Sequence, residues 1–212
     1  VKHIYDLASE KKIECFSMSE QKKMEQYILN NENTRFFGVL LCLYTGLRIG
    51  ELLALEWSDI DMSKGELRVN KTCHYGKDEN GVFGRITDIP KTQSSIRTIP
   101  IPKQLMPHLR EVKKKSLSTH IVSNGSNLIS IRSYQRSFAS LLKRLNIQHR
   151  GFHSLRHTFA THAIQGGVDA KTLAGLLGHT DASFTLDTYT HMTSDMHKHA
   201  SSVVNNMMQQ FL

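Results

Sequence analysis

Apolar residues along most of this chain recur every three or four positions, the spacing of helices that bury one face. Residues 17–30 begin with Ser17, a residue type that caps helix N-termini, and residues 35–45 are apolar nearly all round, as in a buried helix. Gly46 ends that segment, and a short helix is expected at 49–55. The same period predicts further helices at 103–115, 130–145, 153–165, 169–177, 182–190 and 194–211.

The middle of the chain has a different pattern, rich in β-forming residues and broken by Gly-rich or polar turns. Residues 65–74, 82–89 and 95–101 are predicted strands, with Pro90 and Pro100 at strand boundaries. The expected fold class is therefore α+β and mainly helical. It has a small three-stranded antiparallel sheet and a C-terminal tail helix.

Composition narrows the class of protein. A net charge of +8 over 212 residues suits a polyanionic partner, although basic proteins are common. The 3 cysteines are widely spaced and include no Cys-x-x-Cys pair, which favours reduced thiols in a cytoplasmic protein. No apolar run reaches the roughly 18 to 20 residues that a membrane span needs, so we expect no membrane partner.

Two arginines and two histidines have the chemistry to hold a phosphodiester. A phosphodiester under attack gathers negative charge on its non-bridging oxygens, and guanidinium groups bind such oxygens without losing their own charge. Arg48 and Arg156 are the candidates for this clamp. His153 and His179 could take up a hydroxyl proton or hydrogen-bond the phosphate, because neutral imidazole does either near pH 7.

A nucleophile and an acid complete the candidate site. A Tyr189 hydroxyl that attacks phosphorus would form a covalent protein–DNA link, which conserves the bond energy for resealing without ATP or another cofactor. Lys91, between two predicted strands, could protonate the departing sugar oxygen. Other cations near Lys91 in sequence are Lys71, Lys77 and Arg97.

Each candidate also has an ordinary structural explanation. Arg48 could simply pair with Glu51 one helical turn away; within the full set, we expect Glu51 to fix the catalytic guanidinium. His153 and His157, four residues apart, could bind zinc, but no third ligand stands out, so no metal site is expected. His157 is then a buried structural partner. Tyr189 could pack in a core, as a lone helical tyrosine usually does.

The chain resembles the catalytic domain of the tyrosine recombinases, the family of phage integrases and Xer recombinases. The resemblance covers about residues 17–189 and is greatest to integrases of conjugative transposons from Gram-positive bacteria. It rests on six positions in family order, Arg48, Lys91, His153, Arg156, His179 and Tyr189. It implies a tyrosine-recombinase catalytic domain at 17–191. Residues 1–16 would be the linker from an N-terminal core-binding domain, and 192–212 a C-terminal helix that protomers could exchange.

The resemblance also implies an activity and partners. The expected function is site-specific recombination of double-stranded DNA through a 3′-phosphotyrosine intermediate and a four-way junction. A homo-tetramer would act in the bacterial cytoplasm at the nucleoid, with accessory DNA-bending or excision factors possible. Two alternatives stay open: a type IB topoisomerase-like enzyme, and a DNA-binding module that has lost its chemistry.

Overall fold

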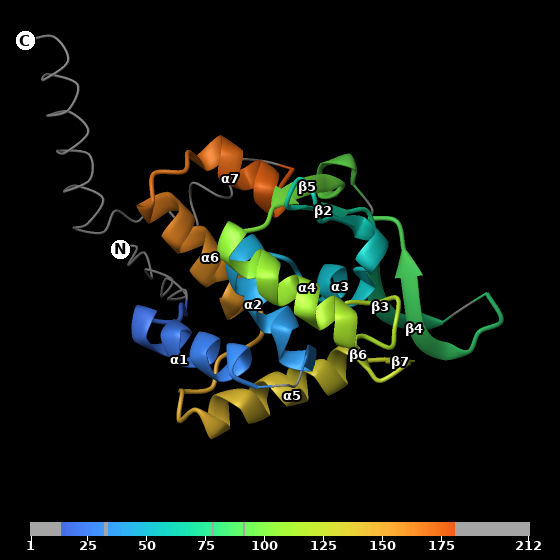
Figure 1. The fold of residues 1–212 in the computed structure, drawn as a ribbon. Helices are drawn as coiled ribbons and strands as arrows, with labels where there is room; N and C mark the ends of the chain where they lie inside the picture. Colours follow the sequence, from blue (N-terminus) through green and yellow to red (C-terminus); the bar gives the residue numbers. More distant parts are fainter. Residues whose placement is uncertain (1–13, 32–33, 78, 91, 181–212) are drawn as a thin grey trace, which may run out of the picture.

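The computed structural model describes residues 14–31, 34–77, 79–90 and 92–180. Figure 1 shows helices packed around a central helix, with short strands along one side. The helices are α1 (Met18–Leu29), α2 (Phe37–Thr45), α3 (Ile49–Ala54), α4 (Met106–Lys115), α5 (Ile131–Arg144), α6 (Ser154–Gln165) and α7 (Ala170–Leu177). The strands are β1 (Ile60–Asp61), β2 (Glu66–Val69), β3 (Thr72–Lys77), β4 (Phe83–Asp88), β5 (Arg97–Pro100), β6 (Ser123–Asn124) and β7 (Asn127–Leu128).

The predicted helices within the described residues are confirmed, and their ends follow the expected capping chemistry. Ser17 accepts a hydrogen bond from the Glu20 backbone N–H at 3.3 Å, and the Glu20 carboxylate accepts one from the Ser17 N–H at 2.8 Å. This reciprocal pair satisfies two amide donors that a helix start leaves without partners. Residues 182–190 and 194–211, also predicted as helices, lie outside the described residues.

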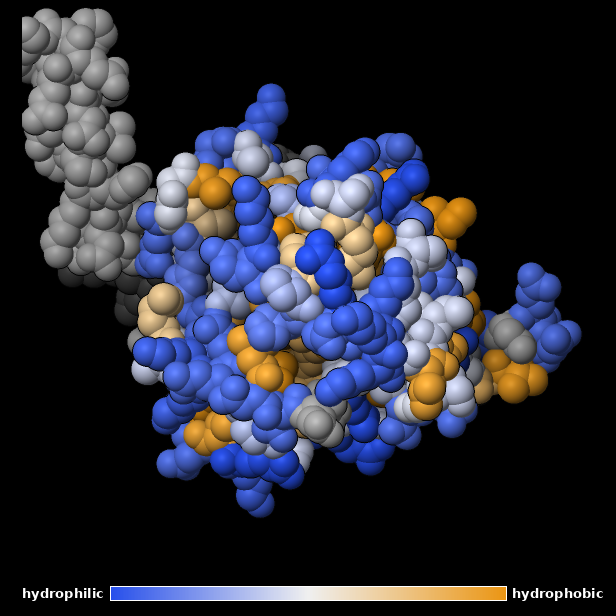
Figure 2. Space-filling model, in the orientation of Figure 1, coloured by the Kyte–Doolittle hydropathy of each residue, from blue (hydrophilic) through white to orange (hydrophobic). Residues whose placement is uncertain are grey.

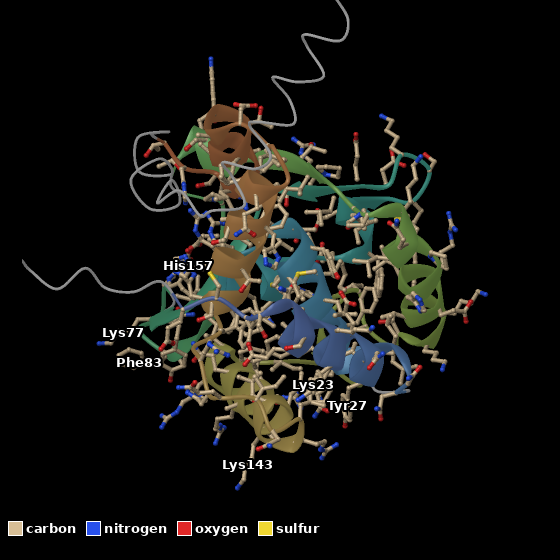
Figure 3. All side chains as sticks on the ribbon, turned by 90° about the vertical axis from the view of Figure 1, so that its left-hand side faces the viewer. Lys23, Tyr27, Lys77, Phe83, Lys143 and His157 are labelled. Carbon is tan, nitrogen blue, oxygen red and sulfur yellow. The ribbon has the colours of Figure 1, made fainter. Side chains whose placement is uncertain are left out.

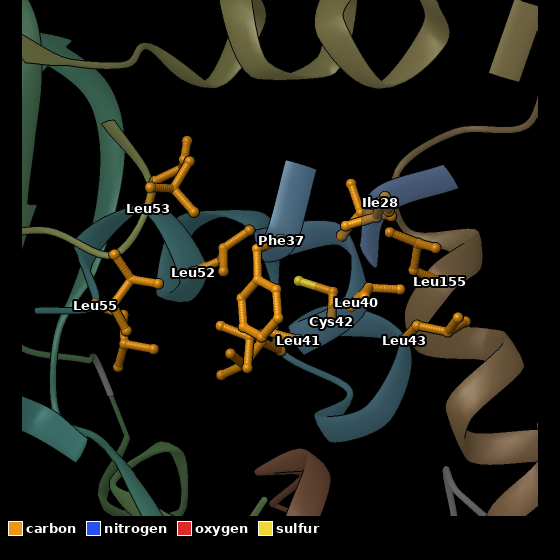
Figure 4. Packing of buried hydrophobic residues seen from close by; sticks show 14 of the residues in the cluster. Ile28, Phe37, Leu40, Leu41, Cys42, Leu43, Leu52, Leu53, Leu55 and Leu155 are labelled. Atoms are coloured by element: carbon orange, nitrogen blue, oxygen red, sulfur yellow. The ribbon is translucent and has the colours of Figure 1, made fainter. Parts of the chain in front are cut away.

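Helix α2 forms the centre of the core. All of its residues except Tyr44 are buried, and the helix lies between α6 on one side and α3 on the other (Figure 4). Leu40 and Leu155 are fully buried at this junction. Phe16, the last residue of the predicted linker, is also buried in the core, and its backbone N–H donates to Thr158 Oγ1 at 2.9 Å. The proposed domain boundaries themselves remain predictions.

The predicted sheet has the expected number of strands but a different membership. The expected strand 65–74 breaks after Val69, where Lys71 forms ion pairs with Glu56 at 2.6 Å and Asp59 at 3.0 Å. β2 joins β1 and β5 in a three-stranded antiparallel sheet, whereas β3 and β4 form a separate two-stranded sheet. The predicted strands at 82–89 and 95–101 are confirmed as β4 and β5, whereas the prediction of one strand at 65–74 was wrong. An alternating pattern locates strands but does not show which strands pair.

The β3–β4 hairpin stands out from the body of the molecule (Figures 1 and 3). Arg85, paired with Tyr75 in the middle of the hairpin, ties it to the body of the molecule by donating from its guanidinium to the carbonyl oxygens of Leu53 and Ile129. Near its outer end, the exposed rings of Tyr75 and Phe83 stack with centroids 6.0 Å apart. Elsewhere on the face shown in Figure 2, hydrophilic side chains surround small, separate hydrophobic patches.

Among the described residues, no helix is both long and apolar enough to cross a membrane.

Candidate active site

Arg48 is placed by the start of helix α3. Its backbone is extended at the N-cap position, and the Arg48 N–H donates to Glu51 Oε2 at 2.8 Å. The Arg48 guanidinium donates through Nη1 to Glu51 Oε1 at 2.9 Å. The predicted contact with Glu51 is confirmed. Because 37% of the Arg48 side chain remains exposed while Glu51 is only 4% exposed, the carboxylate fixes the guanidinium from its buried side.

Arg156, on the first turn of α6, is 2% exposed and extends toward two distant segments. Its Nη1 donates to the Gly46 carbonyl at 2.8 Å, just after α2, and its Nη2 donates to the Leu177 carbonyl at 2.7 Å. The same Nη2 lies 2.8 Å from Nε2 of His179. A buried guanidinium needs such polar partners, so these contacts determine its orientation.

The C-terminus of helix α7 brings three arginines together. Its carbonyl oxygens have no partner within the helix, and the helix dipole adds negative charge there. Leu176 O accepts from Arg97 Nε at 2.6 Å, and Leu177 O accepts from Arg156 Nη2. Gly178 O accepts from Arg48 Nη2 at 3.4 Å. His179 follows Gly178 directly, so the helix end places the His179 imidazole close to the guanidinium groups of Arg156 and Arg48.

Gly178 makes this helix end possible. Its φ of +68° lies in the left-handed region that other residues rarely adopt. The following His179 N–H can then donate back to the Ala174 carbonyl at 3.0 Å. A Cβ at residue 178 would also lie 2.9 Å from Arg97 Nη1. The turn and the close approach of Arg97 therefore both require glycine.

His153 and His179 have strongly lowered pKa values. Burial, followed by the charges of His157 and Arg156, lowers the pKa of His153 to about 4. Burial and then the charges of Arg156 and Arg48 lower the pKa of His179 to about 4. Both rings are consequently neutral at pH 7. A neutral ring has one nitrogen that can accept a proton and one N–H that can donate a hydrogen bond to a phosphate oxygen, as the sequence-based hypothesis requires.

His157 lies one helical turn after His153, and the two ring centroids are 4.6 Å apart at right angles. Burial and the charge of Arg156 lower the pKa of His157, which is half-buried and consistent with a structural partner. Within the part of the chain that the structure describes, no three His, Cys, Asp or Glu side chains group together to hold a metal ion.

Arg97 is the site residue whose role sequence reasoning missed. It was considered only as a cation near Lys91, yet its side chain is 6% exposed and bonded to both Glu51 oxygens. The alternation of buried and exposed residues in β5 places Arg97 on the same buried face as Ile99. An arginine at a buried strand position needs an acidic partner, and that signal was available in the sequence.

The remaining cations near Lys91 have different surroundings. The Lys71 ammonium lies between two carboxylates, which together with its hydrogen bonds raise its pKa despite partial burial. Lys77 lies on the hairpin, with its Nζ 5.0 Å from the Phe83 ring centroid (Figure 3). Lys91 and Tyr189 lie outside the described residues, so their roles remain predictions.

Comparison with known proteins gives the family. Residues 12–196 match the model of the phage integrase family. The chain belongs to this family. It is 37% identical to a XerC-like tyrosine recombinase of Caldanaerobacter subterraneus subsp. tengcongensis over 93% of this chain and 55% of that protein. It is 27% identical to the ICEBs1 integrase of Bacillus subtilis over 93% of this chain and 56% of that protein. The chain thus spans little more than half the length of these relatives.

Solved structures give the fold of this phage integrase family member. The Tn1549 transposon integrase, solved in complex with a circular intermediate DNA, superposes with a TM-score of 0.76 at 22% identity. The match covers 94% of this chain and 68% of that one. The XerA recombinase superposes with a TM-score of 0.67 at 23% identity over 89% of this chain and 64% of that one. The predicted tyrosine-recombinase catalytic fold is confirmed.

Proposed function

We propose that this chain is the catalytic part of a site-specific DNA recombinase, which cuts and rejoins duplex DNA through a 3′-phosphotyrosine intermediate. The observation that carries the proposal is the convergence of Arg48, Arg156 and His179 at one helix end. Residues more than 100 positions apart in sequence contribute to this cluster. Family membership and the net charge of +8 support a DNA substrate.

The two guanidinium groups supply fixed positive charge where a phosphoryl transition state gathers negative charge. Contacts with Gly46, Leu177 and His179 hold Arg156, and Glu51 holds Arg48, so little reorganisation is needed when charge develops. His179, neutral and in contact with Arg156, donates a hydrogen bond to the same phosphate in this scheme. We therefore assign the phosphate clamp to Arg48, Arg156 and His179.

The proposed cleavage step breaks one bond and forms another at phosphorus. The Tyr189 oxygen bonds to phosphorus while the bond to the 5′ oxygen breaks. His153 accepts the tyrosine proton, and Lys91 donates a proton to the departing 5′ oxygen. Attack by a 5′ hydroxyl from a partner strand reverses the step. Two such rounds through a four-way junction in a DNA-bound tetramer complete recombination, with accessory DNA-bending or excision factors setting its direction.

A nicked suicide substrate tests the proposal. The duplex carries the end sequence of the mobile element that encodes the chain, and it loses a short fragment after cleavage, so religation is blocked. We expect a protein–DNA adduct that survives boiling in detergent and is joined through the DNA 3′ end. Tyr189→Phe should bind this DNA but form no adduct, whereas Tyr75→Phe should form it normally.

The other outcomes separate the alternatives. A DNA-binding module would give no adduct with either variant or with the unmodified chain. A metal-dependent nuclease would leave free cut ends. A topoisomerase-like enzyme would form the adduct equally well on duplexes of unrelated sequence. An adduct that persists in Tyr189→Phe would show that another tyrosine is the nucleophile.

A further inference from the structure

Arg97 contacts the C-terminal end of α7, as the clamp residues Arg48 and Arg156 do, but its side chain is buried. The carbonyl oxygens of Leu176, Leu177 and Gly178 accept from Arg97, Arg156 and Arg48 in turn. The Arg48 side chain is 37% exposed, whereas that of Arg97 is 6% exposed. Arg97 therefore shares partners with the clamp but cannot reach a phosphate bound beside it.

Glu51 is shared between these two arginines. Arg97 donates from Nη1 to Oε1 and from Nη2 to Oε2, both at 2.9 Å. Arg48 donates its backbone N–H to Oε2 at 2.8 Å and Nη1 to Oε1 at 2.9 Å. A bidentate pair of this kind fixes the plane of a carboxylate. The plane of Glu51, set by Arg97, then determines where Arg48 Nη1 lies.

Arg97 also fixes the other wall of the site. Its Nε holds the Leu176 carbonyl at 2.6 Å, and its Nη1 donates to the Ser95 carbonyl at 3.0 Å. Ser95 lies four residues after Lys91, in the segment that leads into β5. The two Arg97 hydrogen bonds together connect this segment to the end of α7. One side chain thus links Glu51, the turn that presents His179, and the segment that follows Lys91.

We infer that Arg97 is a positioning residue for DNA cleavage: it occupies the buried side of Glu51 and the end of α7, and so keeps the Arg48 guanidinium directed toward the phosphate beside His179. This inference rests on the proposed recombinase activity. Without Arg97, the whole Glu51 charge would be available to Arg48 alone. Arg48 would be drawn inward, away from the substrate.

Single-turnover cleavage of the suicide duplex by the full chain tests this role. The test variant is Arg97→Met, which keeps an unbranched side chain able to fill the apolar part of the space but removes the charge and all donors. We expect its rate constant at saturating protein to fall by between about tenfold and a hundredfold, the loss that a displaced catalytic group causes. The protein concentration for half-maximal rate should change by less than about threefold, since DNA contacts are retained.

Two further variants separate positioning from folding and from net charge. Arg97→Lys keeps the charge opposite Glu51, but one ammonium group cannot replace the several planar contacts of the guanidinium. Its rate constant should therefore lie between those of the unmodified chain and Arg97→Met. Arg68→Met removes an equal charge from the exposed face of neighbouring β2 and should cleave at the normal rate constant. In a separate reaction with the suicide duplex in excess over protein, the adduct endpoint counts active molecules, so partial unfolding lowers this endpoint and leaves the rate constant at saturating protein unchanged.

A normal rate constant for both Arg97 variants, or a loss confined to the endpoint or to DNA affinity, would overturn the inference. It would leave the proposed function intact. Absence of any adduct with the unmodified chain would instead overturn the proposed function and the inference together.

Discussion

Glu51 should contribute more to the stability of this chain than any exposed acidic residue, because it compensates the buried charge of Arg97. The informative perturbation is Glu51→Gln, which keeps the side-chain volume and one acceptor oxygen. It places an amide NH₂ where the second oxygen faces a guanidinium. The carboxylate now accepts hydrogen bonds from Arg48 N, Arg48 Nη1, Arg97 Nη1 and Arg97 Nη2. The substitution leaves Arg97, 6% exposed, without a counter-charge.

Loss of one partner of a buried ion pair typically costs about 3–5 kcal/mol of unfolding free energy. In a domain of this size, about 1 kcal/mol changes Tm by roughly 2–4 °C, so Tm should fall by roughly 6–20 °C. Burial alone would raise the pKa of Glu51, but the hydrogen bonds and charges of Arg97 and Arg48 hold it below its ordinary value of 4.5. The carboxylate's stabilisation is therefore complete above pH 4.5 and is lost as pH falls through the lower folded-state pKa.

Thermal unfolding at pH 7, followed by circular dichroism, measures the effect. Glu111→Gln is the matched control, because Glu111 also pairs with a cation, Lys114, but is exposed. The control should change the unfolding free energy by less than about 1 kcal/mol. The double variant Glu51→Gln, Arg97→Met removes both buried charges and should lose less stability than the sum of the two single changes. Equal destabilisation by the Glu51 and Glu111 changes would refute this account of the buried pair.

Two further predictions concern the turn that presents His179 and the neutral histidines. Gly178→Ala should lower Tm more than Gly125→Ala: both glycines have positive φ, but only a Cβ at residue 178 meets another atom, 2.9 Å away on Arg97. Equal decreases in Tm for the two variants would show that the contact with Arg97 contributes nothing beyond the backbone strain that both glycines share. NMR titration should place the pKa values of His153 and His179 near 4 in the DNA-free protein, and midpoints near 6.5 would contradict the site electrostatics. As pH falls, these histidines bind protons at a higher pH in the unfolded chain than in the folded protein. The free energy of unfolding should therefore decrease as pH falls from about 6.5 toward 4.

Much of the fold was predictable because it depends on local chemistry. The helix at Met18–Leu29 follows from Ser17 and Glu20 at its start together with its apolar spacing, all within one stretch of chain. The apolar sequence of α2 predicted its central burial for the same reason. The division of residues 65–74 between two sheets was not predictable from alternation, since it depends on which distant strand each half pairs with: β2 pairs with β5, and β3 with β4.

The sequence by itself determined the helical segments, the family resemblance, and the residue types able to hold a phosphodiester. Spacing along the chain even suggested that Glu51 would contact Arg48. Tertiary structure alone decided that Arg156 reaches Gly46 across 110 positions and that Arg97 reaches Leu176 across 79. Local propensity carries no information about such pairs. They form because buried guanidinium groups and the carbonyl oxygens at a helix end must find polar partners wherever the folded core places them.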